Sequence, residues 1–266
     1  MQAPDDTMAV DEDLDIGLDA ARRAGDAALQ MFGRRIKVWR KADGTPVSEA
    51  DLAVDQLLKD TFEAARPGDG WLSEETEDRD IAAGHRFWLA DPIDGTAAFL
   101  GGEAQWCIAL ALIEDGRPTL GIIHAPALAA TYTATAGQGA WLNGAPIRVS
   151  ERAVLPEARV LANAASLRPD RWTTPLPPVQ RIATPSLALR LAAVAEGTSD
   201  AALALAPKHQ WDLAAGDILV REAGGMMSDA GGSAIAYGSG NRSSPFIAAN
   251  TLLHAELLAR RPLPVT

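Results

Sequence analysis

The sequence predicts a mixed α/β (α+β) fold made of an N-terminal and a C-terminal part. In the N-terminal part, two segments with helically spaced apolar residues precede short apolar segments that predict a largely antiparallel sheet. In the C-terminal part, predicted strands and helices alternate, which is typical of layered α/β units. We place the boundary near Ser150, so that an α+β subdomain spans residues 1–150 and an α/β subdomain spans residues 151–266.

Two helices are expected before the first sheet. Apolar residues recur at helical spacing from Leu14 to Phe32, and Gly33 can end this helix. Ser48 and Asp51 form an N-cap pair that opens the second helix, and Pro67 stops it. The chain therefore predicts two helices on the N-terminal side of the first sheet.

The remaining elements follow from short apolar runs and turn residues. Strands are expected at residues 71–73, 87–90, 107–113, 120–124, 132–136, 140–142, 160–162, 179–183, 201–205 and 246–249. Asn143-Gly144 is typical of a two-residue hairpin turn. Helices are expected at residues 186–195, 211–223 and 252–259.

Composition and charge narrow the class of protein. The chain has 266 residues, of which 47% are hydrophobic and 22% charged, a balance that excludes disorder for most of it. A net charge of −11 argues against a nucleic acid polymer or an anionic membrane as partner. The single Cys107 excludes a disulfide framework. No apolar run of about 18 residues and no secretory pattern occurs, so we expect a cytoplasmic protein.

Three acidic clusters, at Glu74-Glu75, at Asp91 to Thr96 and at Asp212, stand at predicted strand ends or helix starts, where α/β folds place their sites. In the second cluster, a tight turn aims Asp91 and Asp94 at one point. Mg²⁺ relieves their mutual repulsion, and the carbonyl of Ile93 is a further candidate ligand.

The backbone after this acidic pair predicts an anion site. Gly95 and Thr96 begin the next helix, and their N–H groups can bind a phosphate. The same residue types are also typical of a surface turn. The apolar segments at 87–90 and 97–100 favour a buried site instead.

These residues resemble two signatures of the inositol monophosphatase superfamily. Residues 88–99, with the order Asp-Pro-Ile-Asp-Gly-Thr, resemble the first signature, and residues 211–225 resemble the second. Ser73-Glu74-Glu75 is similar to the family's Gly-Glu-Glu, with Ser73 as a departure, and residues 41–51 are similar to its upstream segment.

The resemblance implies a five-layer αβαβα sandwich and hydrolysis of a small phosphate ester by a water that two to three Mg²⁺ ions activate. It implies one metal on Glu74, Asp91 and the Ile93 carbonyl, a second on Asp91, Asp94 and Asp212, and a weaker third beside Glu74. It also implies that Thr96, hydrogen-bonded to Asp51, orients the attacking water. The catalytic residues would be Glu74, Asp51 and Thr96, and the substrate and phosphate contacts would be Asp94, Gly95, Thr96, Lys208 and Asp212.

The sequence indicates the identity of the substrate ester less strongly than it indicates the family. Members that act on inositol phosphate carry a glutamate seven residues before the second-signature aspartate, where this chain has Leu205, which cannot accept a hydrogen bond from a hydroxyl. Lys208 is placed to face a second phosphate, so the sequence favours a 3'(2'),5'-bisphosphate nucleotidase, and residues 186–212 resemble that branch. Inositol 1-phosphate and histidinol phosphate are the alternatives, and the family also contains homodimers.

Two other classes of function compete with this interpretation. Haloacid-dehalogenase-type phosphatases use an Asp-x-Asp-Gly-Thr motif, but Asp91 and Asp94 are one residue too far apart for it. A purely binding role, such as contact with transcription machinery, would be indicated by a lost metal ligand, and every expected ligand is present.

Overall fold

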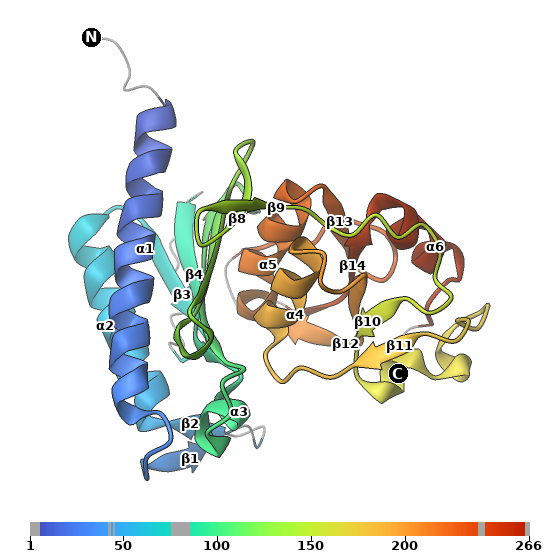
Figure 1. Cartoon of the computed structure of the whole chain (residues 1–266). Coiled ribbons are helices and arrows are strands. Elements are labelled where there is room, and N and C mark those ends of the chain that lie inside the picture. The colour runs from blue at the N-terminus through green and yellow to red at the C-terminus, as the bar shows by residue number, and fades with distance from the viewer. Residues whose placement is uncertain (1–5, 42–43, 45, 76–85, 239–242, 264–266) are drawn as a thin grey trace.

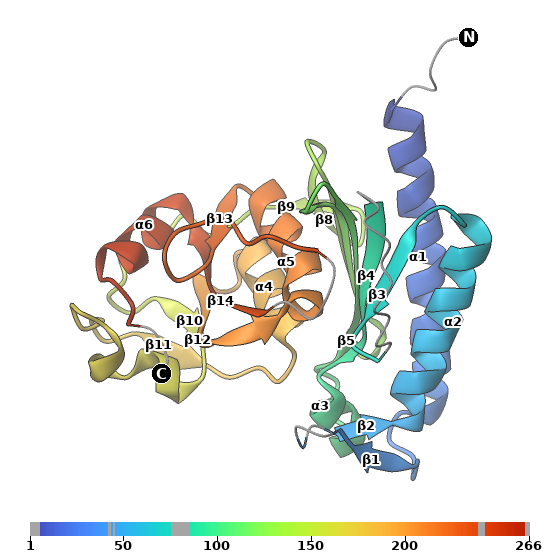
Figure 2. The same cartoon turned by 180° about the vertical axis from the view of Figure 1, so that it is seen from behind.

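The chain forms five layers in the order α, β, α, β, α, as the side-by-side arrangement in Figures 1 and 2 shows. The computed structural model describes residues 6–41, 44, 46–75, 86–238 and 243–263. The helical layers are α1 (Asp6–Met31) with α2 (Glu49–Ala65), then α4 (Leu187–Ala195) with α5 (Gln210–Glu222), and finally α6 (Thr251–Ala259). The expected mixed α/β sandwich is confirmed.

The first β layer has seven strands in the order β3-β4-β5-β6-β7-β8-β9. Only β3 and β4 pair in parallel among these, and every other pair is antiparallel. The strands are β3 (Gly70–Ser73), β4 (Arg86–Asp94), β5 (Cys107–Glu114), β6 (Arg117–Ala125), β7 (Ala130–Thr135), β8 (Gly139–Leu142) and β9 (Ala145–Ile147).

The second β layer has five strands in the order β11-β10-β12-β14-β13. Strand β10 pairs in parallel with β11 and β12, whereas β14 runs antiparallel to both of its neighbours. The strands are β10 (Arg159–Leu161), β11 (Gln180–Ile182), β12 (Ala201–His209), β13 (Gly225–Ser228) and β14 (Ser243–Asn250).

Smaller elements complete the fold. Strands β1 (Val38–Arg40) and β2 (Pro46–Ser48) form a two-stranded ribbon beside the short helix α3 (Thr96–Gly101). The 3₁₀ turns are η1 (Pro126–Leu128), η2 (Ala164–Leu167) and η3 (Pro169–Arg171).

Local sequence signals account for several element boundaries. Helix α2 opens with the expected capping box, in which Ser48 accepts from the backbone of the first turn and Asp51 accepts from the Ser48 backbone, a pairing worth about 1 kcal/mol. Asn143 and Gly144 both have positive φ in the turn between β8 and β9, as a two-residue hairpin requires.

Three apolar cores lie between the layers. One joins α1 and α2 to the seven-stranded sheet and includes Trp88 and Trp106. A second fills both sides of α4 and α5 and so connects the two sheets. The third lies under α6 on the outer face of the five-stranded sheet. Each helical layer thus buries its apolar face against a sheet, which is the main stabilising effect in such a sandwich.

The structure differs from the sequence expectations mainly in strand length. Strand β4 continues through Asp94, where a loop was expected after residue 90, and β12 continues to His209 rather than ending at Leu205. Strands β1, β2 and β13 were not predicted. The boundary predicted near residue 150 lies between β9, the last strand of the first sheet, and β10, the first strand of the second. The division into two subdomains stays a prediction. Within the described residues, none of the helices has the length and apolar character needed to cross a membrane.

Candidate active site

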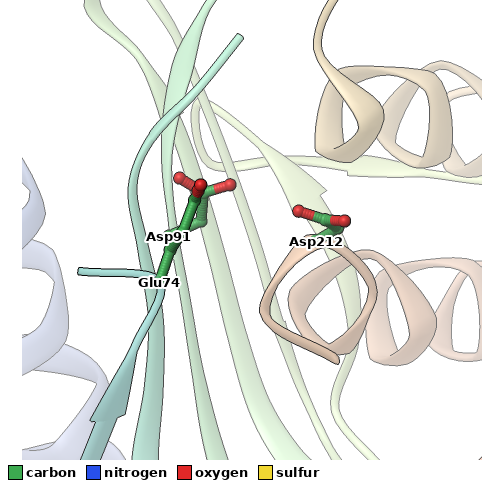
Figure 3. Close-up of side chains that lie close together, drawn as sticks. All are labelled: Glu74, Asp91 and Asp212. Carbon is green, nitrogen blue, oxygen red and sulfur yellow. The ribbon is translucent and has the colours of Figure 1, made fainter. Parts of the chain in front are cut away.

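Three carboxylates from separate elements meet where the two halves of the molecule face each other. Glu74 follows β3, Asp91 lies in β4, and Asp212 lies in the first turn of α5. One oxygen of each lies within 4.8 Å of the others, and Figure 3 shows the three side chains directed toward a common point. Asp91 is buried, whereas Glu74 and Asp212 are partly exposed.

The fold explains why these residues converge. Strands β3 and β4 are parallel neighbours that pair Ser73 with Ala90, and the Glu74 N–H donates to the Ala90 carbonyl at 3.1 Å. Glu74 therefore stands beside Asp91. Asp212 comes from α5, which packs on the same face of the sheet, and its carboxylate accepts from the His209 N–H at 3.1 Å.

A β-bulge turns Asp91 and Asp94 to the same face of β4. Asp91 pairs with Ala109 and Asp94 with Cys107, so β4 has one residue more than β5 over this interval. In a regular strand, residues three positions apart point to opposite faces. The extra residue, not a tight loop, brings both carboxylates to the side of α4 and α5.

Asp94 nevertheless has different partners from the other three acids. Its carboxylate accepts from the Ser186 hydroxyl at 2.6 Å and from the backbone N–H groups of Leu187 and Ala188 at the start of α4. The Cys107 thiol lies 3.9 Å from the same carboxylate. The structure thus places Asp94 as a link between β4 and α4, and its role as a metal ligand stays a prediction.

The electrostatics of this cluster are unfavourable without a cation. Burial raises the pKa of Asp91 well above its ordinary value, and the charges of Glu74, Asp94 and Asp212 raise it further. Burial and neighbouring carboxylates raise the pKa of Asp212 in the same way. Three buried or half-buried oxygens so close together match the hard oxygen ligands that Mg²⁺ prefers, so the residues fit a divalent cation.

Lys41 is the cation that forms an ion pair with this cluster among the described residues. Its Nζ lies 2.8 Å from Glu74 Oε1 and 2.8 Å from Glu75 Oε1. Burial raises the pKa of Glu75 to about 7, against the opposing effect of Lys41. The substituted Ser73 accepts from the Glu75 N–H at 3.2 Å, so the serine supports the acidic segment rather than disturbing it.

Thr96 and Asp51 form the hydrogen bond expected at the edge of the cluster. The Thr96 hydroxyl lies 3.2 Å from Asp51 Oδ1 and 3.1 Å from the Ile93 carbonyl. Burial raises the pKa of Asp51, and hydrogen bonds from Ser48 and Thr96 oppose the rise. Gly95 caps α3 with a φ of 96°, and a Cβ there would come within 3.0 Å of the Gln105 carbonyl, so only glycine fits.

Lys208 lies in strand β12, opposite Ser244 of β14, and not in a loop. It borders a cavity of about 290 Å³ together with Gln210, Ser243 and Ser244. Its charge lowers the pKa of Asp212, which places the ammonium group within electrostatic reach of the cluster. Contact with a substrate stays a prediction.

Three residues near this cluster, Lys41, Ser186 and Arg190, were not predicted from the sequence. Lys41 lay inside a matched segment but had no assigned role, because its partners are more than 30 positions away. Ser186 was expected only as a helix cap, and its bond to Asp94 spans 92 positions. Arg190 is half-buried in α4, and only its Nε has a protein partner among the described residues, the Thr184 carbonyl at 2.7 Å. No local pattern signals contacts of this range.

Comparison with known proteins identifies the family. The sequence model of the Inositol monophosphatase family matches residues 9–262. The "Histidinol-phosphatase" of Mycobacterium tuberculosis is 38% identical, over 94% of this chain and 97% of that protein. The "3'(2'),5'-bisphosphate nucleotidase CysQ" of Salmonella typhimurium is 32% identical, over 82% of this chain and 90% of that protein. The structure of the "Thermotoga maritima IMPase TM1415" superposes with a TM-score of 0.81 at 32% identity, covering 93% of this chain and 96% of that one.

Proposed function

Because the chain belongs to the inositol monophosphatase family and is a phosphoric monoester hydrolase, we propose that Glu74, Asp91 and Asp212 hold the Mg²⁺ of its active site. The observation that carries this proposal is the convergence of the three oxygens within 4.8 Å. Bound there, Mg²⁺ would lower the pKa of a coordinated water and offset charge on the phosphate. The Ile93 carbonyl and Asp94 complete the proposed set of two to three ion sites.

The protein's own residues orient the attacking water. We assign this to Thr96, whose hydroxyl donates to Asp51 or Ile93 and keeps lone pairs that accept a proton from water. The water proton passes through the Thr96 hydroxyl to Asp51, while the water oxygen forms the new bond to phosphorus. The P–O bond to the alcohol breaks in the same displacement, and the leaving alkoxide takes a proton from solvent to give the free alcohol. The raised pKa of Asp51 suits it to receive that proton. The N–H groups of Gly95 and Thr96 bind the phosphate oxygens.

For the substrate, we propose histidinol phosphate. The relative named for this activity covers nearly the whole chain at higher identity than the nucleotidase does, which reverses the order expected from the sequence. Inositol phosphate is disfavoured by Leu205, which is 3% exposed and packs in the core under α6 with Leu203 and Trp172. No carboxylate is available at that position to bind ring hydroxyls.

An adenosine 3',5'-bisphosphate substrate is the second candidate, and two cations favour it. Lys208 lies within electrostatic reach of Asp212, and Arg190 lies within reach of Asp94. A substrate with a second phosphate would have cationic counter-charges near the metal cluster, whereas the ammonium of histidinol would have none from these two residues.

A comparison of three phosphate esters tests both the phosphatase assignment and the choice of substrate. The purified protein with Mg²⁺ is given histidinol phosphate, adenosine 3',5'-bisphosphate or inositol 1-phosphate, and phosphate release gives kcat/KM for each. We expect histidinol phosphate to exceed the others by about tenfold or more, a difference of about 1.4 kcal/mol. A preference for the nucleotide would favour the second candidate, and no hydrolysis of any ester would contradict the phosphatase assignment.

A further inference from the structure

Helix α5 carries a polar stripe that faces away from the metal cluster, buried at Gln210 and Asp217 and exposed at Arg221. Gln210, Asp217 and Arg221 are spaced seven and four positions apart, which places them within about 20° of one line along the helix. Asp212, two positions after Gln210, lies about 160° away around the helix. Asp217 is buried, in a helix whose other buried residues are mostly apolar. A buried carboxylate is costly unless it is paired, so this stripe calls for an explanation.

Asp217 is held by two donors. The Tyr237 hydroxyl donates to its Oδ2 at 2.9 Å, and Arg221 Nε donates to its Oδ1 at 2.9 Å. Tyr237 is itself buried. Arg221 also reaches the Pro118 carbonyl of β6 at 3.4 Å. Asp217 therefore joins α5 to the segment of Tyr237, and its partner Arg221 joins α5 to β6.

The segment that supplies Tyr237 is fixed at two further points. The Tyr237 N–H donates to the Gly116 carbonyl in the turn between β5 and β6 at 3.1 Å. The Gly238 N–H donates to Gln210 Oε1, in the first residue of α5, at 3.1 Å. Residues 237–238 thus run along the stripe and tie it to the seven-stranded sheet, which also carries Asp91.

Apolar packing alone leaves a helix free to make small shifts along or around its axis, because such contacts have no direction. Directional hydrogen bonds at buried polar groups can select one position, as buried polar residues do in some coiled coils. A metal site requires its ligands to be held within about 0.5 Å. The stripe therefore fixes α5 on one side, and Asp212 projects from the other.

We propose that Tyr237 and Asp217 are positioning residues of the metal site: they set where α5, and with it Asp212, stands relative to Glu74 and Asp91. This inference rests on the proposed function, since it takes the three acids to be metal ligands. Neither residue touches metal or substrate. Their effect is on the geometry of Asp212, and so on Mg²⁺ affinity.

The two tyrosines of the chain supply a matched test. Tyr132 is also buried, and its hydroxyl donates to Glu196 at the end of α4 at 3.1 Å. Tyr237→Phe and Tyr132→Phe therefore delete the same group and the same kind of bond, but only the first bond is on α5. Mg²⁺ is titrated by calorimetry into each metal-free protein, and the melting temperature is recorded alongside.

We expect Tyr237→Phe to weaken Mg²⁺ binding about three- to tenfold, at or below the lower end of what outer partners of metal ligands contribute. Tyr132→Phe is expected to bind Mg²⁺ as the unchanged protein does, even if both variants melt a few degrees earlier. Excess Mg²⁺ should restore hydrolysis in Tyr237→Phe. Equal Mg²⁺ affinity in the two variants would overturn the positioning role.

Two further variants distinguish a failure of the positioning inference from a failure of the proposed metal site. Asp217→Asn keeps the size of the side chain but presents an amide to Arg221, and we expect it to weaken Mg²⁺ binding as Tyr237→Phe does, so it serves if the latter does not fold. Unchanged Mg²⁺ affinity in Asp217→Asn would also overturn the role. Asp212→Asn should abolish most of the Mg²⁺ binding. If it binds Mg²⁺ normally, the proposed metal site fails, and the positioning inference fails with it.

Discussion

Strand β4 has a charged cluster at each end, and the two clusters are balanced in opposite ways. At its start, Arg86 contacts Asp13 at 2.6 Å, Asp69 at 2.9 Å and Glu114 at 2.9 Å. Asp13 is also paired with Arg66 at 2.7 Å. At its other end, Glu74, Asp91, Asp94 and Asp212 lie close together, and Lys41 alone forms an ion pair with one of them among the described residues.

The two clusters differ in whether each acid has a cationic partner within the folded chain. At the start of β4 each buried acid has a fixed guanidinium partner, so this cluster is complete as folded and joins α1, α2 and the sheet. At the far end the carboxylates repel one another, which raises the pKa values of Asp91 and Asp212. A cluster that is complete only when a cation binds is suited to hold one.

The largest effect is expected for Asp91→Asn. Loss of a ligand oxygen should lower kcat/KM at least about a thousandfold, which corresponds to about 4 kcal/mol. The same change removes a repelled charge, so the metal-free protein should melt at a higher temperature than the unchanged one at neutral pH. Phosphate release and thermal unfolding measure the two effects. If Asp91→Asn keeps its activity, Asp91 is not a ligand of the catalytic metal.

At the start of β4 we expect a substitution to lower stability and leave activity unchanged. Arg86→Met should lower the free energy of unfolding by about 2–3 kcal/mol, because Asp13 and Asp69 lose a partner while Arg66 remains. Its kcat should be unchanged below the melting temperature. Urea unfolding measures the loss, and Arg23→Met, in an exposed pair with Asp19, is the control with less than about 1 kcal/mol. Equal losses in the two variants would contradict a structural role for this cluster.

The smallest expected effect is the dependence of the melting temperature on pH and on Mg²⁺. The folded-state pKa values of Asp91 and Asp212 are raised above the ordinary value of 3.8, so their stabilising contribution is complete below that value and is lost as pH rises through the folded pKa. The metal-free protein should therefore melt at lower temperature at about pH 8 than at about pH 5. Mg²⁺ at ten times its Kd adds about 1.4 kcal/mol, and this gain should grow with pH because protons compete for the same oxygens.

Thermal unfolding at several pH values with and without Mg²⁺ tests this prediction. The Asp91→Asn protein should respond less to both variables. A melting temperature that rises with pH in the metal-free protein, or an equal Mg²⁺ response in the variant, would count against the cluster as the source.

Local patterns were sufficient for much of the fold. The capping box at Ser48 and the hairpin turn at Asn143 are short-range signals, and both are confirmed. Matches to two family signatures were sufficient to identify the superfamily and its sandwich, which the comparisons confirm. Asp91 and Asp212 lie within these signatures, and Glu74 lies in the acidic segment that accompanies them, so sequence motifs alone predicted all three converging acids.

Long-range contacts could not be predicted in this way. Lys41, which follows β1, meets Glu74 and Glu75, which follow β3, only because the fold brings these two chain segments together. Tyr237 reaches Gly116 across about half the chain. The length of β12 was underestimated because Pro207 reads as a strand terminator, whereas the strand passes it with a shift in register against β14.

The extra residue of β4 also releases backbone groups from the sheet. Between Asp91 and Asp94 the ladder with β5 is interrupted, and there the Ile93 N–H donates to Asp91 Oδ1 while the Ile93 carbonyl accepts from the Thr96 hydroxyl. A deletion of one residue in this interval would leave the two acids two positions apart and still on one face. It would, however, return the intervening peptide to the ladder and withdraw its carbonyl from Thr96. The three-residue spacing of the aspartates therefore serves the backbone between them more than the carboxylates themselves.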